Sequence, residues 1–374
     1  MSDRLSWIIL RRAISGIVIV ISLILVVSFY FSYLHWISIK TCSTGWIGSV
    51  HKLDAALGYV PIPCSNGMTI LSKDVKIPVY YDCNGFRIAS VGSPGQLGSP
   101  RSHVDSLLAL GCSFTFGFGV PSEHTYCSQL AKKMGVSPLN AGRCSYGLAE
   151  MVTLARQIIP AFKPKTVLVQ YSPWLVDRSR LRYAPSFFGL LPHPYFVSGP
   201  EGSIKIHRPD FMSAIFDLDF EVFRHSHHTF GDFLNFSLSR KFPSIAHDLL
   251  HSSLVRLKES LALVPTPEQD TEKIVRSAYL EIESICSRHG SNMVIVVLGM
   301  DNTLTIVPES FKKLKSKMVD SQAVLIDRLK TSSMEEYAKA YYHWGKNPSV
   351  IIDRHPNIHA HEIIAESVLS ETSF

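Results

Sequence analysis

Charged residues are scarce in this chain: Asp, Glu, Lys and Arg make up 18% of its 374 residues, whereas hydrophobic residues make up 46%. That composition excludes an intrinsically disordered polypeptide. A large charge surplus is also missing, because Lys and Arg outnumber Asp and Glu by only 37 to 31. Without residues 1–40, which hold four basic residues and one acidic residue, the ratio is 33 to 30. A nucleic-acid-binding protein shows a basic stripe, so nucleic acid is not an expected partner.

Spacings typical of zinc sites are absent as well, since the seven cysteines include no CxxC pair. An odd number of cysteines cannot be fully paired within one chain. Cys64 and Cys83 lie in one loop-rich segment, where they either form a disulfide, if the segment lies outside the cytoplasm, or remain buried thiols. The His-rich stretch 224–228 lacks a carboxylate or cysteine at ligand spacing. We interpret it as a solvated loop and expect neither a metal nor another cofactor.

One long uncharged run, residues 13–36, stands near the N-terminus. At about 1.5 Å per residue a helix of this length spans roughly 36 Å, enough to cross the hydrocarbon core of a bilayer. Tyr30, Tyr33 and Trp36 lie near its distal end, and three arginines precede it within residues 4–12. This arrangement predicts a cytoplasmic segment 1–12 and everything after Trp36 outside. A cleaved signal peptide has a shorter apolar region and a small-residue cleavage site. We therefore expect an uncleaved signal anchor in the inner membrane, with the lipid bilayer as a partner and the rest of the chain on the periplasmic side.

The remainder of the chain predicts an α/β fold. Residues 37–100 are rich in Gly, Pro, Ser and Asn with short β-type runs, and we expect a mostly extended lead-in segment without a core of its own. From residue 105 onward, apolar strand patterns alternate with helical ones. The predicted strands are 105–111, 138–141, 165–171, 292–300 and 322–327, and the predicted helices are 122–134, 148–162, 268–289 and 359–370. This alternation is typical of a parallel sheet covered by helices on both faces.

Residues 173–267 interrupt that alternation with a stretch rich in aromatics, Pro and His. We interpret it as an insertion into the domain 101–374. Open α/β folds bind ligands at the carboxyl edge of the sheet, and we expect the insertion to cover that edge.

A serine follows the first core strand, in the turn Gly111–Gly117 that precedes a helix. Ser113 at such a turn is exposed at the sheet edge, and its N–H near the helix start can face a developing oxyanion. The alternative is a plain helix cap, a common role for Ser and Thr. The segment Asp353-Arg354-His355, just before the last helix, favours a catalytic role for Ser113 over a helix cap. A carboxylate two residues from a histidine can hold the Nδ1 proton and leave Nε2 free to take a proton from a serine.

These two segments resemble the SGNH (GDSL-type) hydrolases, a superfamily of esterases, lipases and acyltransferases. The first block of that superfamily, Gly-Asp-Ser-x-Thr-x-Gly, corresponds to Gly111–Gly117 with Cys112 at the Asp position, and the last block corresponds to Asp353–Asn357. The resemblance implies a flavodoxin-like three-layer α/β/α sandwich. It also implies that Ser113 is the nucleophile, His355 the general base and Asp353 the residue that orients it.

Two other blocks of the superfamily are altered here. The position of the glycine whose N–H contributes to the oxyanion hole is taken by Ser145, whose N–H can still donate if the backbone conformation is kept. Trp174 stands where the family has an oxyanion-binding asparagine. Loss of such a donor costs roughly 10²–10³ in kcat, so either the Trp174 indole or Ser172 replaces it, or the site is slow or non-catalytic. The predicted oxyanion hole comprises Ser113, Ser145 and Trp174.

The resemblance implies serine-dependent hydrolysis of an acyl ester, as in a carbohydrate esterase. With a membrane anchor, the expected substrate is an acylated envelope polysaccharide or exopolysaccharide outside the cytoplasm. The same three residues also serve an O-acyltransferase, and a non-catalytic carbohydrate-binding or assembly protein is a further alternative.

Overall fold

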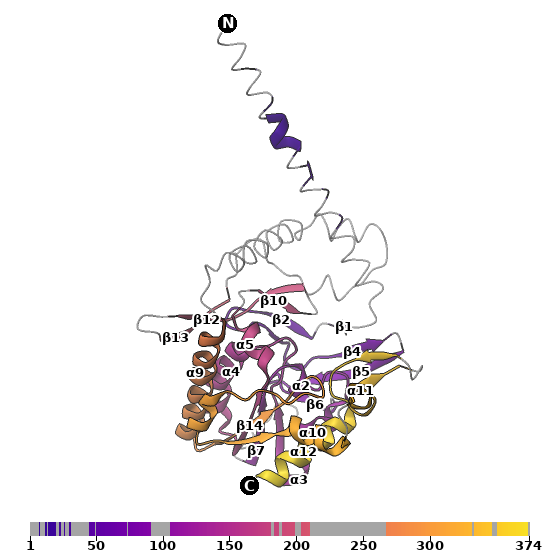
Figure 1. Ribbon diagram of the computed structural model, residues 1–374, viewed down its shortest axis with the longest axis vertical. Coiled ribbons are helices and arrows are strands. Elements are labelled where there is room, and N and C mark those ends of the chain that lie inside the picture. The colour runs from indigo at the N-terminus through magenta and orange to yellow at the C-terminus, as the bar shows by residue number, and fades with distance from the viewer. Residues whose placement is uncertain are drawn as a thin grey trace. The chain divides into compact units, whose positions relative to one another are not determined.

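The computed structural model describes residues 45–48, 50–72, 74–90, 105–180, 183–186, 189–198, 203–209, 267–330, 333–345 and 350–372, together with isolated helical positions between Trp7 and Tyr30 (Figure 1). The chain divides into two units, residues 1–42 with 212–265 and residues 43–211 with 266–374, and all strands described below belong to the second. Most of the predicted anchor 13–36 and all of the stretch 224–228 lie outside the described residues. None of the helices in the described part combines the length and the apolar character that a membrane crossing requires.

A nine-stranded sheet forms the centre of this second unit. Five of its strands are parallel: β8 (Ser137–Asn140), β7 (Ser106–Leu110), β9 (Thr166–Tyr171), β14 (Asn292–Val297) and β15 (Lys317–Asp320). Taken in chain order their arrangement is 2-1-3-4-5, the flavodoxin-like order. Every residue of β7 and β9 is buried, as expected for strands that are covered on both faces. The prediction of an α/β fold with a parallel core sheet is confirmed.

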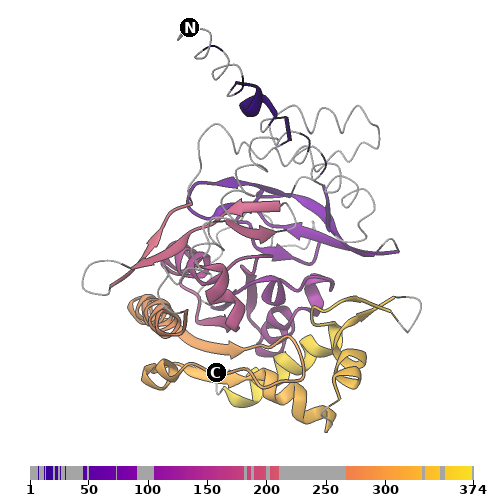
Figure 2. The same ribbon diagram turned by 45° about the horizontal axis from the view of Figure 1, so that its top comes forward.

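The lead-in segment completes the same sheet. Strands β1 (Gly45–Ile47), β4 (Asn66–Ser72), β5 (Val75–Tyr81) and β6 (Arg87–Ile88) continue it in antiparallel fashion beyond β8 (Figure 2). A separate hairpin pairs β2 (His51–Asp54) with β3 (Gly58–Pro61). The segment is extended as predicted. Its apolar side chains share one buried cluster with residues of the domain that follows, namely Val50, Leu71, Val79 and Tyr81 with Phe116, Phe118 and Cys144.

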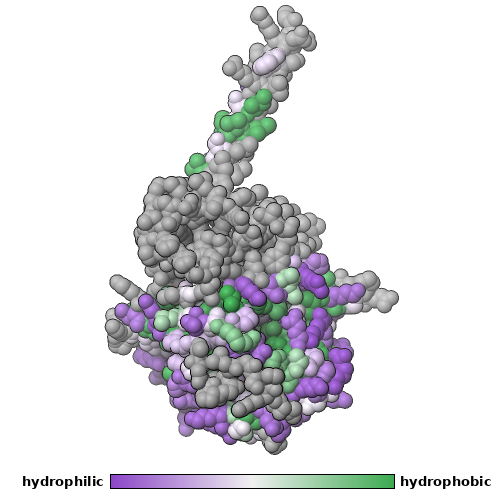
Figure 3. All heavy atoms as spheres, turned by 180° about the vertical axis from the view of Figure 1, so that it is seen from behind, coloured by the Kyte–Doolittle hydropathy of each residue, from purple (hydrophilic) through white to green (hydrophobic). Residues whose placement is uncertain are grey.

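Helices pack on both faces of the sheet. Helix α4 (Leu148–Phe162) packs against α9 (Pro267–Arg288) on one face, and α3 (Tyr126–Met134), α10 (Ser321–Leu329) and α12 (Ile358–Glu371) pack together on the other (Figure 1). Their apolar residues are turned inward, and the described surface in Figure 3 is mostly polar with small apolar areas. The chain also forms α11 (Met334–Tyr341) between α10 and α12, which the sequence analysis did not predict.

The predicted strand 322–327 is wrong. These residues lie in α10, and the strand of the sheet is β15, which ends at Asp320 immediately before the helix. The Asp320 side chain accepts a hydrogen bond from Ala323 N at 2.9 Å and so caps α10. A short apolar run such as Ala323–Ile326 has no periodicity that separates a strand from a buried helix.

The described part of the insertion is more regular than its composition suggested. It begins with a short helix, α5 (Pro173–Arg178), which is followed by the hairpins β10–β11 (Tyr183–Ser186, Gly189–Pro192) and β12–β13 (Tyr195–Ser198, Ile204–His207). Beside the second hairpin, buried His193 contacts the Glu150 carboxylate in the first turn of α4. Residues 210–266 lie outside the described part.

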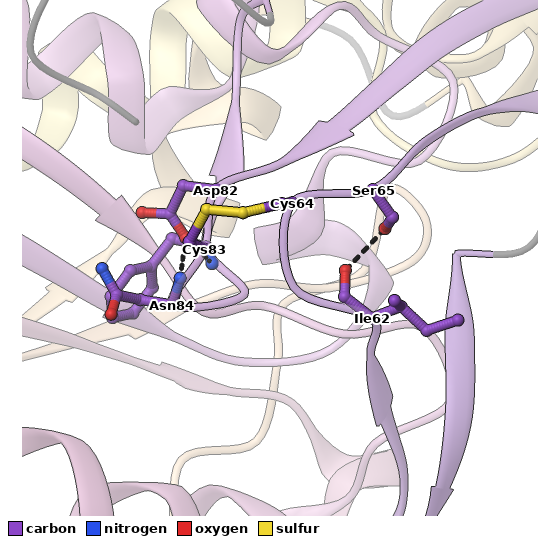
Figure 4. The surroundings of a disulfide bond; sticks show 7 residues. Ile62, Cys64, Ser65, Asp82, Cys83 and Asn84 are labelled. Atoms are coloured by element: carbon purple, nitrogen blue, oxygen red, sulfur yellow. Dashed lines mark hydrogen bonds between the residues drawn. A yellow bond between two sulfur atoms is a disulfide. The ribbon is translucent and has the colours of Figure 1, made fainter. Parts of the chain in front are cut away.

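The Cys64–Cys83 disulfide is present (Figure 4), so of the two alternatives for this pair the disulfide is confirmed. It joins the turn after β3 to the turn after β5, with the two Cα atoms 4.4 Å apart. The neighbouring Asp82 carboxylate accepts from the backbone N–H groups of Asn84 and Phe86 at 2.9 and 2.8 Å. The turn that precedes β6 is therefore fixed by both a covalent and a hydrogen-bonded constraint. Four other cysteines, Cys112, Cys127, Cys144 and Cys286, are buried free thiols.

Candidate active site

Ser113 stands at the start of a four-residue helix, α2 (Ser113–Phe116), directly after β7. The tight strand-to-helix turn requires Gly111, because a Cβ at this position would collide with the Thr115 hydroxyl and the Gln170 side chain. Ser113 is only 5% exposed. Its backbone N–H is the first of the helix, and such an N–H has no acceptor within its own helix.

The structure brings His355 and Asp353 to Ser113. Asp353 ends β17 (Ile351–Asp353), which pairs with β16 (His343–Trp344). One carboxylate oxygen of Asp353 accepts from His355 N at 2.7 Å and lies 2.6 Å from His355 Nδ1. The other ring nitrogen, Nε2, lies 2.8 Å from Ser113 Oγ. A proton on Nδ1 satisfies the first contact, and Nε2 then accepts from the serine hydroxyl.

Asp353 is set up to be ionised. Burial is the largest influence and opposes ionisation, but the hydrogen bonds and positive charge of His355, with a smaller contribution from His343, outweigh it and hold the pKa of Asp353 below its ordinary value. The carboxylate thus remains charged at neutral pH and can stabilise a protonated His355.

Two aromatic rings flank the imidazole. The ring centroids of Phe114 and Phe118 lie 5.3 and 4.9 Å from that of His355, and both phenylalanines are buried. Behind the histidine, the Asn357 side chain donates to the carbonyls of Ala340 and Tyr342 at 2.8 and 3.1 Å. These contacts fix the loop between β17 and α12 and so limit the rotation of the imidazole away from Ser113.

The loop after β8 carries Ser145, which has a positive φ of 64°. This left-handed conformation is uncommon for residues other than glycine. No described residue accepts a hydrogen bond from Ser145 N–H. The backbone conformation that the sequence analysis required is therefore kept, and this N–H is available to a ligand.

Two substitutions at Ser145 test whether this conformation matters. Ser145→Gly removes the steric cost and is expected to leave stability within about 1 kcal/mol of the wild type, with kcat retained. Ser145→Val keeps the N–H but places a β-branched side chain at positive φ, and we expect it to cost about 1–3 kcal/mol and to lower kcat. Urea unfolding and ester hydrolysis measure the two effects. Equal kcat in the two variants would contradict a role for the backbone at this position.

Trp174 and Ser172 were the two alternatives for the missing asparagine, and the structure separates them. The Ser172 hydroxyl donates to Leu298 O at 2.7 Å and accepts from Gln170 Nε2 at 2.9 Å, so its proton is already used. The Trp174 indole N–H is buried and has no hydrogen-bond partner among the described residues. Its ring packs against Phe114, with 5.2 Å between centroids. Of the two, only the indole offers a free donor.

The side chain of Gln170, which supports the turn that carries Ser113, was not predicted from the sequence. Gln170, at the end of β9, accepts from Cys112 N at 3.0 Å and from the Thr115 hydroxyl at 2.7 Å, and its Nε2 donates to Cys112 Sγ at 3.2 Å. A polar residue within the otherwise apolar run 166–171 was the available signal. Cys112 is a buried thiol that packs in the interior and accepts this weak hydrogen bond.

His361, six residues after His355, is not part of the reacting group. It is fully buried, stacks on Tyr126 with 5.8 Å between centroids, and accepts from Tyr126 N at 3.2 Å through Nδ1. Burial, reinforced by nearby cationic groups, lowers the pKa of His361 to about 3. A neutral imidazole here contributes packing and one hydrogen bond to the interior.

No protein-family model matches the sequence, and no curated protein is significantly similar to it. Among solved structures, a putative lipolytic protein of the G-D-S-L family from Desulfitobacterium hafniense is 11% identical, with a TM-score of 0.35 and coverage of 72% of this chain and 99% of that one. An acetylxylan esterase from Geobacillus stearothermophilus is 15% identical, with a TM-score of 0.36 and coverage of 74% and 96%. At this level of similarity these structures decide nothing about the chemistry of this chain.

Proposed function

We propose that this protein is a serine-dependent acyl ester hydrolase whose nucleophile is Ser113. The observation that carries the proposal is the continuous series of contacts from Asp353 Oδ1 to His355 Nδ1 (2.6 Å) and from His355 Nε2 to Ser113 Oγ (2.8 Å). Such an arrangement lets the imidazole take the serine proton as the oxygen attacks an ester carbonyl.

The proposed reaction has two halves. Ser113 Oγ attacks the acyl carbon, its proton moves to His355 Nε2, and the negative oxygen is held by the N–H groups of Ser113 and Ser145 and by the Trp174 indole. The protonated His355 then gives its proton to the leaving alkoxide, which leaves an acyl-Ser113 ester. In the second half His355 takes a proton from water as the water oxygen attacks the acyl carbon. It then gives this proton to Ser113 Oγ as the bond between Oγ and the acyl carbon breaks, which releases the carboxylic acid and regenerates the serine.

The proposed substrate is an acylated carbohydrate outside the cytoplasm. Two observations support the location: the uncharged run 13–36, proposed as an inner-membrane anchor, and the Cys64–Cys83 disulfide, a bond that persists mainly in oxidising compartments. Protease added to intact spheroplasts is expected to degrade the domain. Protection of the domain until the membrane is lysed would contradict this location.

Release of acetate tests the function. The full-length chain in detergent is expected to hydrolyse a chromogenic acetyl ester and to release acetate from an acetylated oligosaccharide, and the Ser113→Ala variant is expected to do neither. Addition of unacetylated oligosaccharide measures transfer, since an O-acyltransferase would pass the acyl group to the sugar in preference to water. A folded protein that binds the oligosaccharide but releases no acetate would instead support the non-catalytic alternative, to which the loss of the asparagine at position 174 points.

Replacement of Trp174 by phenylalanine removes the proposed indole donor and keeps an aromatic ring against Phe114. We expect kcat to fall by roughly 10²–10³ with little change in KM, because the hydrogen bond is made to the transition state. A folded Trp174→Phe variant with wild-type kcat would show that the Trp174 N–H is not an oxyanion donor.

A further inference from the structure

We propose that the lead-in segment is a working part of the active site, and that Arg87 is the positioning residue through which it holds the Ser113 turn. The inference rests on the proposed function, because it concerns the geometry of the same serine. It assigns a catalytic consequence to strands that lie before the α/β core in the sequence.

Arg87 is a buried cation whose contacts are carbonyl groups. Its side chain is 1% exposed, and no carboxylate forms a salt bridge with it within the described ranges. The guanidinium donates instead to the carbonyl oxygens of Phe116, Gly117 and Val120 and lies over the Phe116 ring, 4.2 Å from its centroid. Burial lowers the pKa of Arg87 to about 10, so the group is still charged at neutral pH.

Two of these carbonyls, Phe116 O and Gly117 O, lie at the end of the helix that starts with Ser113, and Val120 O belongs to the turn that follows it. Helix α2 has four residues and ends at Gly117, which has a φ of 79°. A helix this short is not stable by itself, and its last carbonyl groups have no partner within the helix. A fixed cation next to them satisfies the carbonyls and matches the negative end of the helix dipole. The position of Ser113 therefore depends on a group that β6 supplies.

The pairing of β6 with β8 also supports the loop that carries Ser145. Arg87 on β6 is the register partner of Asn140 on β8. The Asn140 side chain donates to Thr115 O at 3.0 Å and accepts from Gly142 N at 3.0 Å. One amide thus ties the Ser113 helix to the start of the loop 141–147, so the two backbone N–H groups of the proposed oxyanion hole, those of Ser113 and Ser145, share this support.

The lead-in contacts this loop directly at two further points. The Arg143 guanidinium donates to Gly85 O, in the turn that the disulfide adjoins (Figure 4), and to Gly142 O at 2.8 Å. The Tyr59 hydroxyl donates to Cys144 O, immediately before Ser145. On the other side of Ser145, the Tyr146 hydroxyl donates to Tyr59 O. The lead-in therefore holds the chain on both sides of Ser145, which supports its positive φ.

The test compares Arg87→Met, Arg87→Lys and the control Arg156→Met in the full-length protein. Arg156, on α4, also uses its guanidinium for hydrogen bonds, but to Glu281 of α9 at an exposed position. We expect Arg87→Met to lower kcat about 100-fold with KM nearly unchanged. Arg87→Lys is expected to recover part of the loss because an ammonium can still donate to these carbonyls, and Arg156→Met is expected to keep kcat. The rate of fluorophosphonate labelling at Ser113 should follow kcat.

Tyr59→Phe keeps the proposal testable if Arg87→Met does not fold. It removes only the hydroxyl that holds Cys144 O, and we expect kcat to fall about 10-fold in a folded protein. A folded Arg87→Met variant with wild-type kcat, or Tyr59→Phe with wild-type kcat where Arg87→Met fails to fold, would overturn the inference and leave the proposed function intact. A wild-type protein that is neither hydrolytic nor labelled would overturn the proposed function, and the inference with it.

Discussion

Replacement of Ser113 by alanine is expected to lower kcat for ester hydrolysis by roughly 10⁴–10⁶, and replacement of His355 by alanine is expected to cost about as much. Each change removes one member of a single proton-transfer unit, joined by the 2.8 Å contact between Ser113 Oγ and His355 Nε2. The double variant should therefore be no slower than either single variant. Hydrolysis of a chromogenic acetyl ester measures kcat, and near-ultraviolet circular dichroism confirms folding.

His359→Ala is the matched control for the histidine. His359 lies four residues further along, in the first turn of α12, where it is exposed and 3.7 Å from Glu362. Such a surface pair contributes about 0–1 kcal/mol, so kcat is expected to be unchanged. Losses that multiply in the Ser113→Ala/His355→Ala variant would mean that the two residues act independently, contrary to the mechanism.

The second large effect is expected for Asp353→Asn, which should lower kcat at neutral pH by about 10⁴. An asparagine presents an oxygen or an N–H₂ to His355 but no charge, so it neither fixes the Nδ1 proton reliably nor stabilises the imidazolium that forms. The substitution is nearly isosteric, and the 2.7 Å contact with His355 N can persist. The loss is expected in kcat, with the fold retained. Asp327→Asn, at an exposed position of α10, is the control.

The pKa of Asp353 also gives the sign of a stability effect. Because this pKa lies below its ordinary value, ionised Asp353 stabilises the folded state at pH values above the unfolded value of about 3.9. That contribution is lost as the pH falls through the lower pKa that Asp353 has in the folded state. As the pH falls from neutral to about 4 the free-energy difference between wild type and Asp353→Asn should not shrink, and it should shrink only at lower pH. A difference that already disappears between pH 7 and pH 5 would contradict an ionised Asp353.

The core of the fold and the reacting residues were predictable because their signals are local. Strand β9 is a short, nearly continuous apolar run, and helix α4 shows the apolar spacing of a helix. Ser113 lies in a turn with a recognisable motif. Asp353 and His355 were expected near Ser113 because they precede the last helix, where the chain of an open α/β fold returns to the ligand-binding edge of the sheet. In the structure Asp353 ends β17, which forms a separate two-stranded sheet with β16. The assignment failed at 322–327, where a four-residue apolar run does not distinguish a strand from a helix.

The contribution of the lead-in was not predictable from local patterns. Strand β6 has two residues, and its pairing with β8 joins positions that are 53 residues apart, Arg87 and Asn140. Nothing in the neighbourhood of Arg87 indicates that its partners are three carbonyl groups beyond Ser113. Likewise, the Ser172 hydroxyl is not free because it donates to Leu298 O, which lies at the end of another strand, and this contact cannot be read from the residues around Ser172 and Trp174.

The most direct measurement is the reaction of the intact, folded protein with a fluorophosphonate, followed by mass spectrometry of the labelled peptides. An esterase of the proposed kind acquires one adduct, on Ser113, and the rate of labelling collapses in His355→Ala while it persists in His359→Ala. A folded protein that stays unlabelled, or that reacts at another residue with Ser113 unmodified, would contradict the account.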